Sequence, residues 1–158
     1  MSNYKLIAFS DSHGSPRRMY DAMKSHRDAD MFVHLGDGCG EFLALRSEFP
    51  NVMFTAVRGN CDIGVGLPKY DDYAVLGTKR IFLTHGNRYG VQYDTLNLHN
   101  YAKENNFHVA LYGHTHIKKI EYRDGIYTAN PGSISQPRDG MPPSFLIIDV
   151  RGDDILLS

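Results

Sequence analysis

The sequence has only two cysteines, no long apolar run and no excess of charge of either sign. A helix that crosses a bilayer needs about 20 consecutive apolar residues, and no stretch approaches that length, so no membrane span or membrane partner is expected. Cys39 and Cys61 show no repeating spacing, and the N-terminus carries no signal-peptide pattern. We therefore expect two free thiols in a reducing compartment and a cytoplasmic protein.

The formal net charge of −1 excludes a global basic field that would hold nucleic acid through counterion release. The sequence also has no internal repeat, no low-complexity segment and no linker-like stretch. A chain of 158 residues is close to the commonest size of a single domain. We predict one domain over residues 1–158 and no nucleic-acid partner.

The first part of the chain alternates strand-like and helix-like segments. Apolar, β-rich runs at 4–10, 31–35 and 52–57 each stop at a loop that contains glycine. A helix is predicted to open at Pro16, with Met19, Ala22 and Met23 on its apolar face, and a second is predicted from Glu41 to Phe49. Strands that alternate with helices favour an α/β fold with parallel pairing.

The second part is richer in strands. The patterns predict hairpins formed by 73–76 with 80–84 around Gly77-Thr78, by 117–122 with 126–129, and by 145–150 with 155–157, and a separate strand over 108–112. A helix capped by Asp94 is expected to run to about Asn106, with Leu96, Tyr101 and Ala102 facing inward. Nine or ten strands against three or four helices predict an α/β protein with two packed β-sheets (a β-sandwich) flanked by helices.

Five strands end in the same way, with an apolar run followed by a polar cluster beside glycine. The clusters are Asp11-x-His13, Gly36-Asp37, Gly59-Asn60, His85-Gly86 and Gly113-His114-Thr-His116. The carboxyl ends of strands in open α/β sheets gather at one edge, where ligands bind. Glycine beside each polar residue permits a sharp turn and a close approach to a ligand. We therefore expect these seven polar side chains to meet at one edge.

Two carboxylates, one amide and four imidazoles suit Mn²⁺, Fe, Zn²⁺ or Ni²⁺ better than Ca²⁺ or Mg²⁺ alone. Seven ligands are too many for one tetrahedral site but suit two ions that share a carboxylate bridge. Such a pair lies about 3.5–4 Å apart in enzymes that hydrolyse phosphate esters, and it activates a bound water as the nucleophile. The chemistry that these residues indicate is phosphoester hydrolysis at a pocket that favours an anionic substrate.

The ordered motifs Asp-x-His, Gly-Asp, Gly-Asn-x-Asp, His-Gly and Gly-His-Thr-His resemble those of the calcineurin-like metallophosphoesterases, in particular the small phosphodiesterases of bacteria and archaea. The resemblance extends from Asp11 to Ser133 and implies a four-layer fold in which two sheets are flanked by helices. It implies that one metal is bound by Asp11, His13, Asp37 and His116, and that a second is bound by Asn60, His85 and His114, with Asp37 as the bridge. Two divalent ions are expected, with Mn²⁺ preferred and Ni²⁺, Zn²⁺ or Fe as alternatives.

The sequence departs from the family pattern at two positions. Many members have a histidine after the Gly-Asn pair, whereas this chain has Cys61, as the small phosphodiesterase branch does. A thiol is a poor general acid near pH 7, so slower turnover and a bias toward good leaving groups are expected. Asn87 replaces another frequent histidine and can still donate to a phosphate oxygen. Asn60, Cys61 and His114 are the predicted catalytic residues, and Arg58 and Asn87 the predicted substrate contacts.

Several residues have a plain structural interpretation beside the functional one. Asp11 and Asp37 could merely cap the helices that follow them, and His85 taken alone could be a core histidine. The sequence leaves open whether the segment 130–133 is a tight turn or a turn at the edge of the site. The remaining histidines lack the glycine neighbours, or lie within an apolar strand, and are predicted to be structural: His26, His34, His99 and His108.

The function that these residues predict is metal-dependent phosphodiester hydrolysis of a small organic phosphoester. A phosphomonoesterase is the nearest enzymatic alternative. A non-catalytic scaffold is the alternative from another class, because the superfamily includes a eukaryotic retromer subunit with a degraded site. All seven ligand positions are filled here, which favours the enzyme. Tyrosines near 70–73 and 89–93 are compatible with a homodimer.

Overall fold

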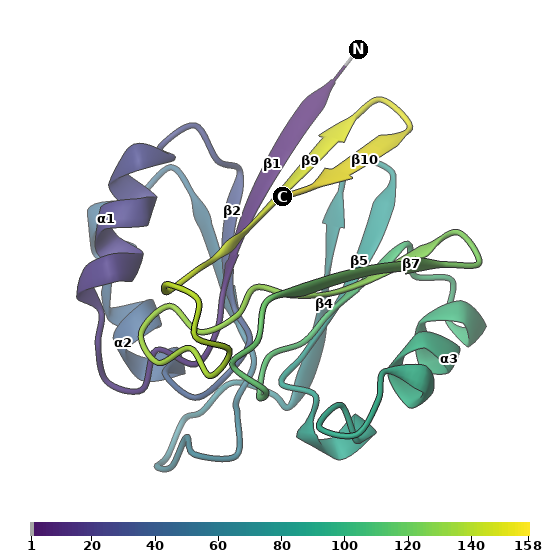
Figure 1. Cartoon of the computed structure of the whole chain (residues 1–158). Helices are drawn as coiled ribbons and strands as arrows, with labels where there is room; N and C mark the ends of the chain where they lie inside the picture. The colour runs from purple at the N-terminus through teal and green to yellow at the C-terminus, as the bar shows by residue number, and fades with distance from the viewer. Residues whose placement is uncertain (1) are drawn as a thin grey trace.

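The computed structural model describes residues 2–158 (Figure 1). Its strands are β1 (Asn3–Phe9), β2 (Met31–His34), β3 (Met53–Ala56), β4 (Asp71–Leu76), β5 (Lys79–Thr84), β6 (Val109–Leu111), β7 (Lys119–Arg123), β8 (Ile126–Asn130), β9 (Leu146–Arg151) and β10 (Asp154–Leu157). Its α-helices are α1 (Arg17–Ser25), α2 (Cys39–Ala44) and α3 (Leu96–Glu104), and two 3-10 turns are η1 (Arg46–Glu48) and η2 (Asn87–Tyr89). No helix among these residues is both long and apolar enough to cross a membrane.

The strands form two mixed sheets of five strands each. The order in the first sheet is β10-β9-β1-β2-β3, and that in the second is β4-β5-β6-β8-β7. Parallel pairing joins β1 to β2 and β2 to β3, as the alternating strands and helices predict, and it also joins β5 to β6 and β6 to β8. The parallel strands of each sheet therefore share one direction, and their carboxyl ends form one edge of that sheet.

Three apolar cores separate four layers. The central core packs the two sheets together through residues such as Leu6, Val33 and Leu111. A second core lies between the first sheet and the helices α1 and α2, where Met19, Met23 and other apolar side chains are buried. A third core packs α3 on the second sheet. The order of layers is thus helix, sheet, sheet, helix, with α1 and α2 on one side and α3 on the other (Figure 1).

Two details of the helix prediction are wrong. The segment predicted as one helix from Glu41 to Phe49 is the short helix α2 followed by the 3-10 turn η1, and α2 begins earlier, at Cys39. Leu96 was predicted to face inward but is 47% exposed, because Leu98, His99 and Ala102 form the buried face of α3. The periodicity alone permits either face, and the position of α3 against β6 and β8 decides between them.

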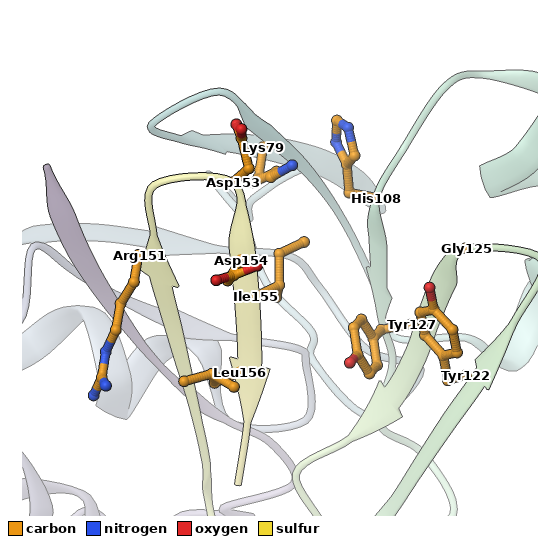
Figure 2. A pocket seen from close by; sticks show the side chains of 10 residues that line it. All are labelled: Lys79, His108, Tyr122, Gly125, Tyr127, Arg151, Asp153, Asp154, Ile155 and Leu156. Carbon is orange, nitrogen blue, oxygen red and sulfur yellow. The ribbon is translucent and has the colours of Figure 1, made fainter. Parts of the chain in front are cut away.

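A cavity of about 540 Å³ opens at the end of the sandwich where the parallel strands begin (Figure 2). Lys79 at the start of β5, His108 before β6 and the hairpin residues Asp153 and Asp154 contribute to its lining. Its charges are of both signs. The polar clusters of the sequence analysis follow the opposite ends of the strands, so this cavity lies away from them.

Candidate metal centre

The predicted ligands come together where the carboxyl-end edges of the two sheets meet. Loops after β1, β2 and β3 contribute from the first sheet, and loops after β5 and β6 contribute from the second. Backbone hydrogen bonds join neighbouring loops: Asp11 N–H donates to the Gly36 carbonyl, and Gly113 N–H donates to the His85 carbonyl. One shared edge was expected from the sequence, and in the structure both sheets contribute to it.

The first half of the centre contains Asp11, His13 and His116, whose potential ligand atoms all lie within 4.8 Å of one another. Asp11 Oδ1 lies 3.3 Å from His116 Nε2 and 3.7 Å from His13 Nε2, and the two Nε2 atoms are 3.1 Å apart. Ligand atoms that share a divalent ion at about 2.0–2.3 Å are separated by similar distances. These three side chains could therefore hold one ion.

The second half contains Asp37, His85 and His114, again within 4.8 Å of one another. His85 Nε2 lies 3.2 Å from Asp37 Oδ2 and 3.2 Å from His114 Nδ1, which in turn lies 3.1 Å from Asn60 Oδ1. Asp37 Oδ2 is also 3.8 Å from His13 Nε2. Asp37 thus stands between the two halves, and Asn60 lies beside the second.

Backbone carbonyls orient two of the imidazoles. His85 Nδ1–H donates to the Leu35 carbonyl at 2.7 Å, and His116 Nδ1–H donates to the Gln136 carbonyl at 2.6 Å. Each bond places the proton on Nδ1 and leaves Nε2 as an acceptor that faces the centre. Histidine ligands of metals usually donate their second N–H in this way.

Five of the candidate ligands have a left-handed backbone. The φ angles are 55° at Asp11, 45° at His13, 60° at Asp37, 71° at His114 and 61° at His116. Only two other non-glycine residues among those described, Asn106 and Asp124, have positive φ. Such conformations cost about 1–3 kcal/mol each and cluster at functional sites. The concentration of strain at these five positions favours a functional role over simple helix capping.

The Asp11 carboxylate is charged and incompletely paired, which fits a cation. Burial would raise the pKa of Asp11, but contacts with His116, His13 and Ser10 outweigh burial and hold that pKa well below its usual range. Asp11 Oδ2 accepts hydrogen bonds from Ser10 Oγ and His114 N–H, whereas the buried Oδ1 has no hydrogen-bond partner. A buried carboxylate oxygen without a partner is costly unless a cation occupies the space it faces. The residues therefore fit a bound divalent ion.

Glycines keep the backbone close to both carboxylates. A Cβ at Gly59 would lie 2.1 Å from Asp37 Oδ1, and one at Gly113 would lie 1.9 Å from Ser10 Oγ and 2.8 Å from Asp11 Oδ2. Either methyl group would force the carboxylate to move. The glycines beside the polar clusters are thus needed for close approach, which is how the sequence analysis interpreted them.

Asp62, which the sequence analysis did not select as a site residue, fixes the loop that carries Asp37. Its carboxylate accepts N–H groups from Asp37 and Gly59 at 2.8 Å each and from Gly38 at 2.9 Å. Cys61 N–H donates to Asp37 Oδ1 at 2.7 Å, so the Asp37 side chain is fixed as well. Asp62 is the last residue of the Gly-Asn-x-Asp motif, so the sequence marks its position. Only the fold shows which backbone N–H groups its carboxylate accepts.

The segment 130–133 lies at the edge of the site, which resolves the alternative that the sequence left open. Asn130 Nδ2 donates to the Gly113 carbonyl and to Thr115 Oγ1, and Ser133 Oγ donates to the Asp11 carbonyl. The segment therefore ties the loop after β6 to the loop after β1.

The predicted substrate contacts lie in different surroundings. Arg58 Nε donates to the Pro68 carbonyl at 2.7 Å, and the guanidinium stacks 4.4 Å from the centre of the Tyr70 ring. Asn87 begins η2, two residues after His85, and is half-buried. The exposed Arg138 was not predicted from the sequence, and its backbone N–H donates to the His116 carbonyl at 3.3 Å. Burial lowers the pKa of His114, and the positive charge of Arg138 lowers it further.

His34 is fully buried behind the centre, as predicted, and supports it through a hydrogen-bonded chain. Gly36 N–H donates to His34 Nδ1, His34 Nε2–H donates to Ser12 Oγ, and Ser12 Oγ–H donates to Glu41 Oε2. Burial lowers the pKa of His34 from 6.5 to about 4. The chain therefore requires a neutral imidazole.

This burial makes a prediction about acid stability. As pH falls from 6.5 to about 4, His34 becomes protonated in the unfolded protein but stays neutral in the folded protein. The free energy of unfolding should then fall by up to about 1.4 kcal/mol per pH unit from this group. In urea unfolding of metal-stripped protein, His34→Asn, which keeps an acceptor for Gly36 N–H, should show a shallower acid slope than the parent. Equal slopes would contradict the assignment.

Comparison with known proteins agrees with this geometry. Residues 4–153 match the calcineurin-like phosphoesterase superfamily domain. The chain belongs to this superfamily. It is 31% identical to the probable metallophosphoesterase YsnB of Bacillus subtilis over 150 residues, which are 94% of this chain and 85% of YsnB.

Two further relatives place this metallophosphoesterase among small phosphoesterases. It is 37% identical over 101 residues to the phosphodiesterase YfcE of Escherichia coli, a match that covers 60% of this chain and about half (51%) of YfcE. A solved structure from Streptococcus pneumoniae, described as a predicted phosphoesterase, superposes with a TM-score of 0.82 at 28% identity, covering 99% of this chain and 88% of that one. The α/β sandwich and the His/Asp clusters are thus those of a phosphoesterase that binds divalent metal.

Proposed function

We propose that this metallophosphoesterase is a binuclear phosphodiesterase that hydrolyses a small organic phosphoester. The observation that carries the proposal is the position of Asp37, which belongs to two of the three ligand clusters found among the described residues. In this assignment Asp11, His13, Asp37 and His116 hold one ion, and Asn60, His85 and His114 hold the second. We propose Mn²⁺ as the preferred ion, with Ni²⁺, Zn²⁺ or Fe as alternatives.

Two bound divalent ions would supply an activated water and neutralise charge on the phosphoryl group. The protein's own residues orient the metal ligands and contact the substrate. Leu35 and Gln136 fix the rings of His85 and His116 through their carbonyls, so both Nε2 atoms stay aimed inward. Asn60 and Asn87 offer amide donors and Arg138 offers a guanidinium to the phosphate oxygens. Arg58, already bonded to Pro68, would reach a substrate only through its remaining guanidinium N–H groups.

The preference for diesters is inferred from Cys61. Burial raises the pKa of the Cys61 thiol above its ordinary value of 9.0, and the Asp37 carboxylate raises it further. Cys61 therefore offers neither positive charge nor an easily released proton near pH 7. A phosphomonoester dianion depends more on a cationic partner than a diester monoanion does, so the diester is favoured.

The proposal is tested with metal-stripped protein assayed with Mn²⁺, Ni²⁺, Zn²⁺ or Mg²⁺ on matched aryl phosphodiester and phosphomonoester substrates. We expect faster diester cleavage that requires added metal. Faster monoester cleavage would make the protein a phosphomonoesterase on the same metal centre. Bound metal without any esterase activity would favour the scaffold alternative.

Replacing Cys61 by histidine should add a general-acid candidate. We expect Cys61→His to raise kcat for alkyl esters, which have poor leaving groups, by about 10-fold or more, and to change aryl esters less. The measurement is the ratio of alkyl to aryl ester rates in the variant and the parent. Equal changes in both rates, or a fall in both, would contradict a role for this position in leaving-group protonation.

Location and partners are also proposals. The two cysteines are free, with Cys39 buried and Cys61 exposed, which is consistent with the cytoplasmic location inferred from the sequence. Tyr70, Tyr73 and Tyr93 are exposed, and we propose that they contribute to the interface of a homodimer. Size-exclusion chromatography with light scattering would measure the oligomeric state directly.

A further inference from the structure

A third ligand cluster lies on the solvent side of the first half of the centre. It contains Cys61 together with His13 and Asp37, and the sulfur, nitrogen and oxygen atoms lie within 4.8 Å of one another. His13 also belongs to the first cluster and Asp37 to the second. The Cys61 sulfur is therefore part of the same centre rather than a separate surface thiol.

An independent observation places a cation in this half. Asp11 is fully buried, and its Oδ1 has no hydrogen-bond partner although it faces His116 Nε2 at 3.3 Å and His13 Nε2 at 3.7 Å. A buried carboxylate oxygen in this state needs a positive charge opposite to it. His13 belongs both to this cluster and to the one that contains Asp37 and Cys61.

The other anionic groups near Cys61 already have partners. A cavity of about 250 Å³ is lined by His13, Asp37, Glu41, Cys61 and Asp62, among others. Glu41 Oε2 accepts hydrogen bonds from Ser12 Oγ and Gly14 N–H, and both oxygens of Asp62 accept backbone N–H groups. The Cys61 sulfur lies 3.6 Å from Asn60 Nδ2 and faces the Asp37 carboxylate.

The geometry points to Cys61 as a thiolate ligand of the divalent ion held beside His13 and Asp37. On ion binding the thiol would release its proton to solvent, as metal-bound cysteines do. A soft sulfur ligand would raise the affinity of this position for Zn²⁺ or Co²⁺ relative to a site with only nitrogen and oxygen ligands. This inference rests on the metal-dependent function proposed above. It agrees with the diester preference, since a metal-bound thiolate cannot donate a proton.

Cobalt provides a readout that does not depend on activity. Metal-stripped protein is titrated with Co²⁺, and the near-ultraviolet thiolate-to-cobalt charge-transfer absorption is recorded. The band is expected in the parent protein, unchanged in Cys39→Ser and absent in Cys61→Ser. Cys39 is the matched control because it is the other cysteine of the chain and is buried in the core as the first residue of α2. The Cys61→Ser variant should also bind Zn²⁺ about tenfold or more weakly, with a smaller change for Mg²⁺.

Thiol alkylation distinguishes a Cys61 sulfur that ligates the ion from one that only lies near it. A bound Co²⁺ that ligates the sulfur should slow alkylation of the exposed Cys61 by about tenfold or more, whereas a nearby ion that does not ligate it would favour the thiolate and speed the reaction. Two bound Co²⁺ ions without the band, a band that survives in Cys61→Ser, or faster alkylation would each overturn the inference. Metal-dependent diester hydrolysis that persists in those cases would leave the proposed function standing.

Discussion

Replacing Asp37 by asparagine is expected to remove both metal ions and to lower esterase activity by at least about a hundredfold. Asp37 Oδ2 lies 3.2 Å from His85 Nε2 and 3.8 Å from His13 Nε2, so the same oxygen borders both halves of the centre. An amide is a far weaker ligand than a carboxylate for two positive ions, and even changes to groups that only support a ligand weaken metal binding about 10–100-fold. Elemental analysis after dialysis measures the ions per chain.

The matched control is Asp153→Asn, which removes the same charge from an exposed residue at the opposite end of the sandwich. It should keep both ions and full activity. Thermal unfolding of the metal-stripped proteins should show that both variants remain folded. Retention of two tightly held ions by Asp37→Asn would contradict the bridging assignment. Retention of one ion would mean that Asp37 is a ligand of only one of the two ions.

The second large effect is expected at Asp62, which contacts the centre only through the backbone. Asp62→Ala leaves three N–H groups without their acceptor, those of Asp37, Gly38 and Gly59. Each lost acceptor costs about 1 kcal/mol where water can partly replace it, so the free energy of unfolding should fall by about 2–4 kcal/mol. Since the loop that carries Asp37 loosens, metal affinity should fall about 10–100-fold.

Asp62→Asn gives a graded comparison, because one amide oxygen can still accept N–H groups. We expect an intermediate loss of stability and of metal affinity, and none for Asp153→Ala. A structural role alone would lower stability without changing metal affinity in the folded protein. Urea unfolding together with metal titration well below the melting temperature distinguishes that outcome from the positioning role.

The sequence predicts the layers and the strand ends well, because both depend on local pattern. Apolar runs that stop at glycine lead to β1, β2 and β3, and the two-residue turn at Gly77-Thr78 leads to the β4–β5 hairpin. Polar residues after those runs meet at one edge, since parallel strands in each sheet share a direction. The apolar pattern could not decide which face of α3 is buried, nor that the helix after Gly38 ends at Ala44.

The supporting contacts could not be predicted from the sequence. The carbonyls of Leu35 and Gln136 orient two imidazoles, and any residue type supplies a carbonyl. The left-handed φ angles of Asp11 and His116 depend on the surrounding loops, because histidine and aspartate adopt such angles only occasionally. Arg138 belongs to no motif, and its backbone N–H reaches the His116 carbonyl only because the segment after β8 folds back toward the centre.

The place of β1 in its sheet has a consequence for how the chain is made. β1 lies between β2 and β9, and β9 is synthesised more than a hundred residues later. At the usual speed of a ribosome this interval is on the order of ten seconds, during which one edge of an apolar strand has no partner. Pairings between segments so far apart also form slowly. The first strand of a nascent chain is therefore exposed to aggregation during this interval, and the first sheet is complete only after β9 and β10 have been translated.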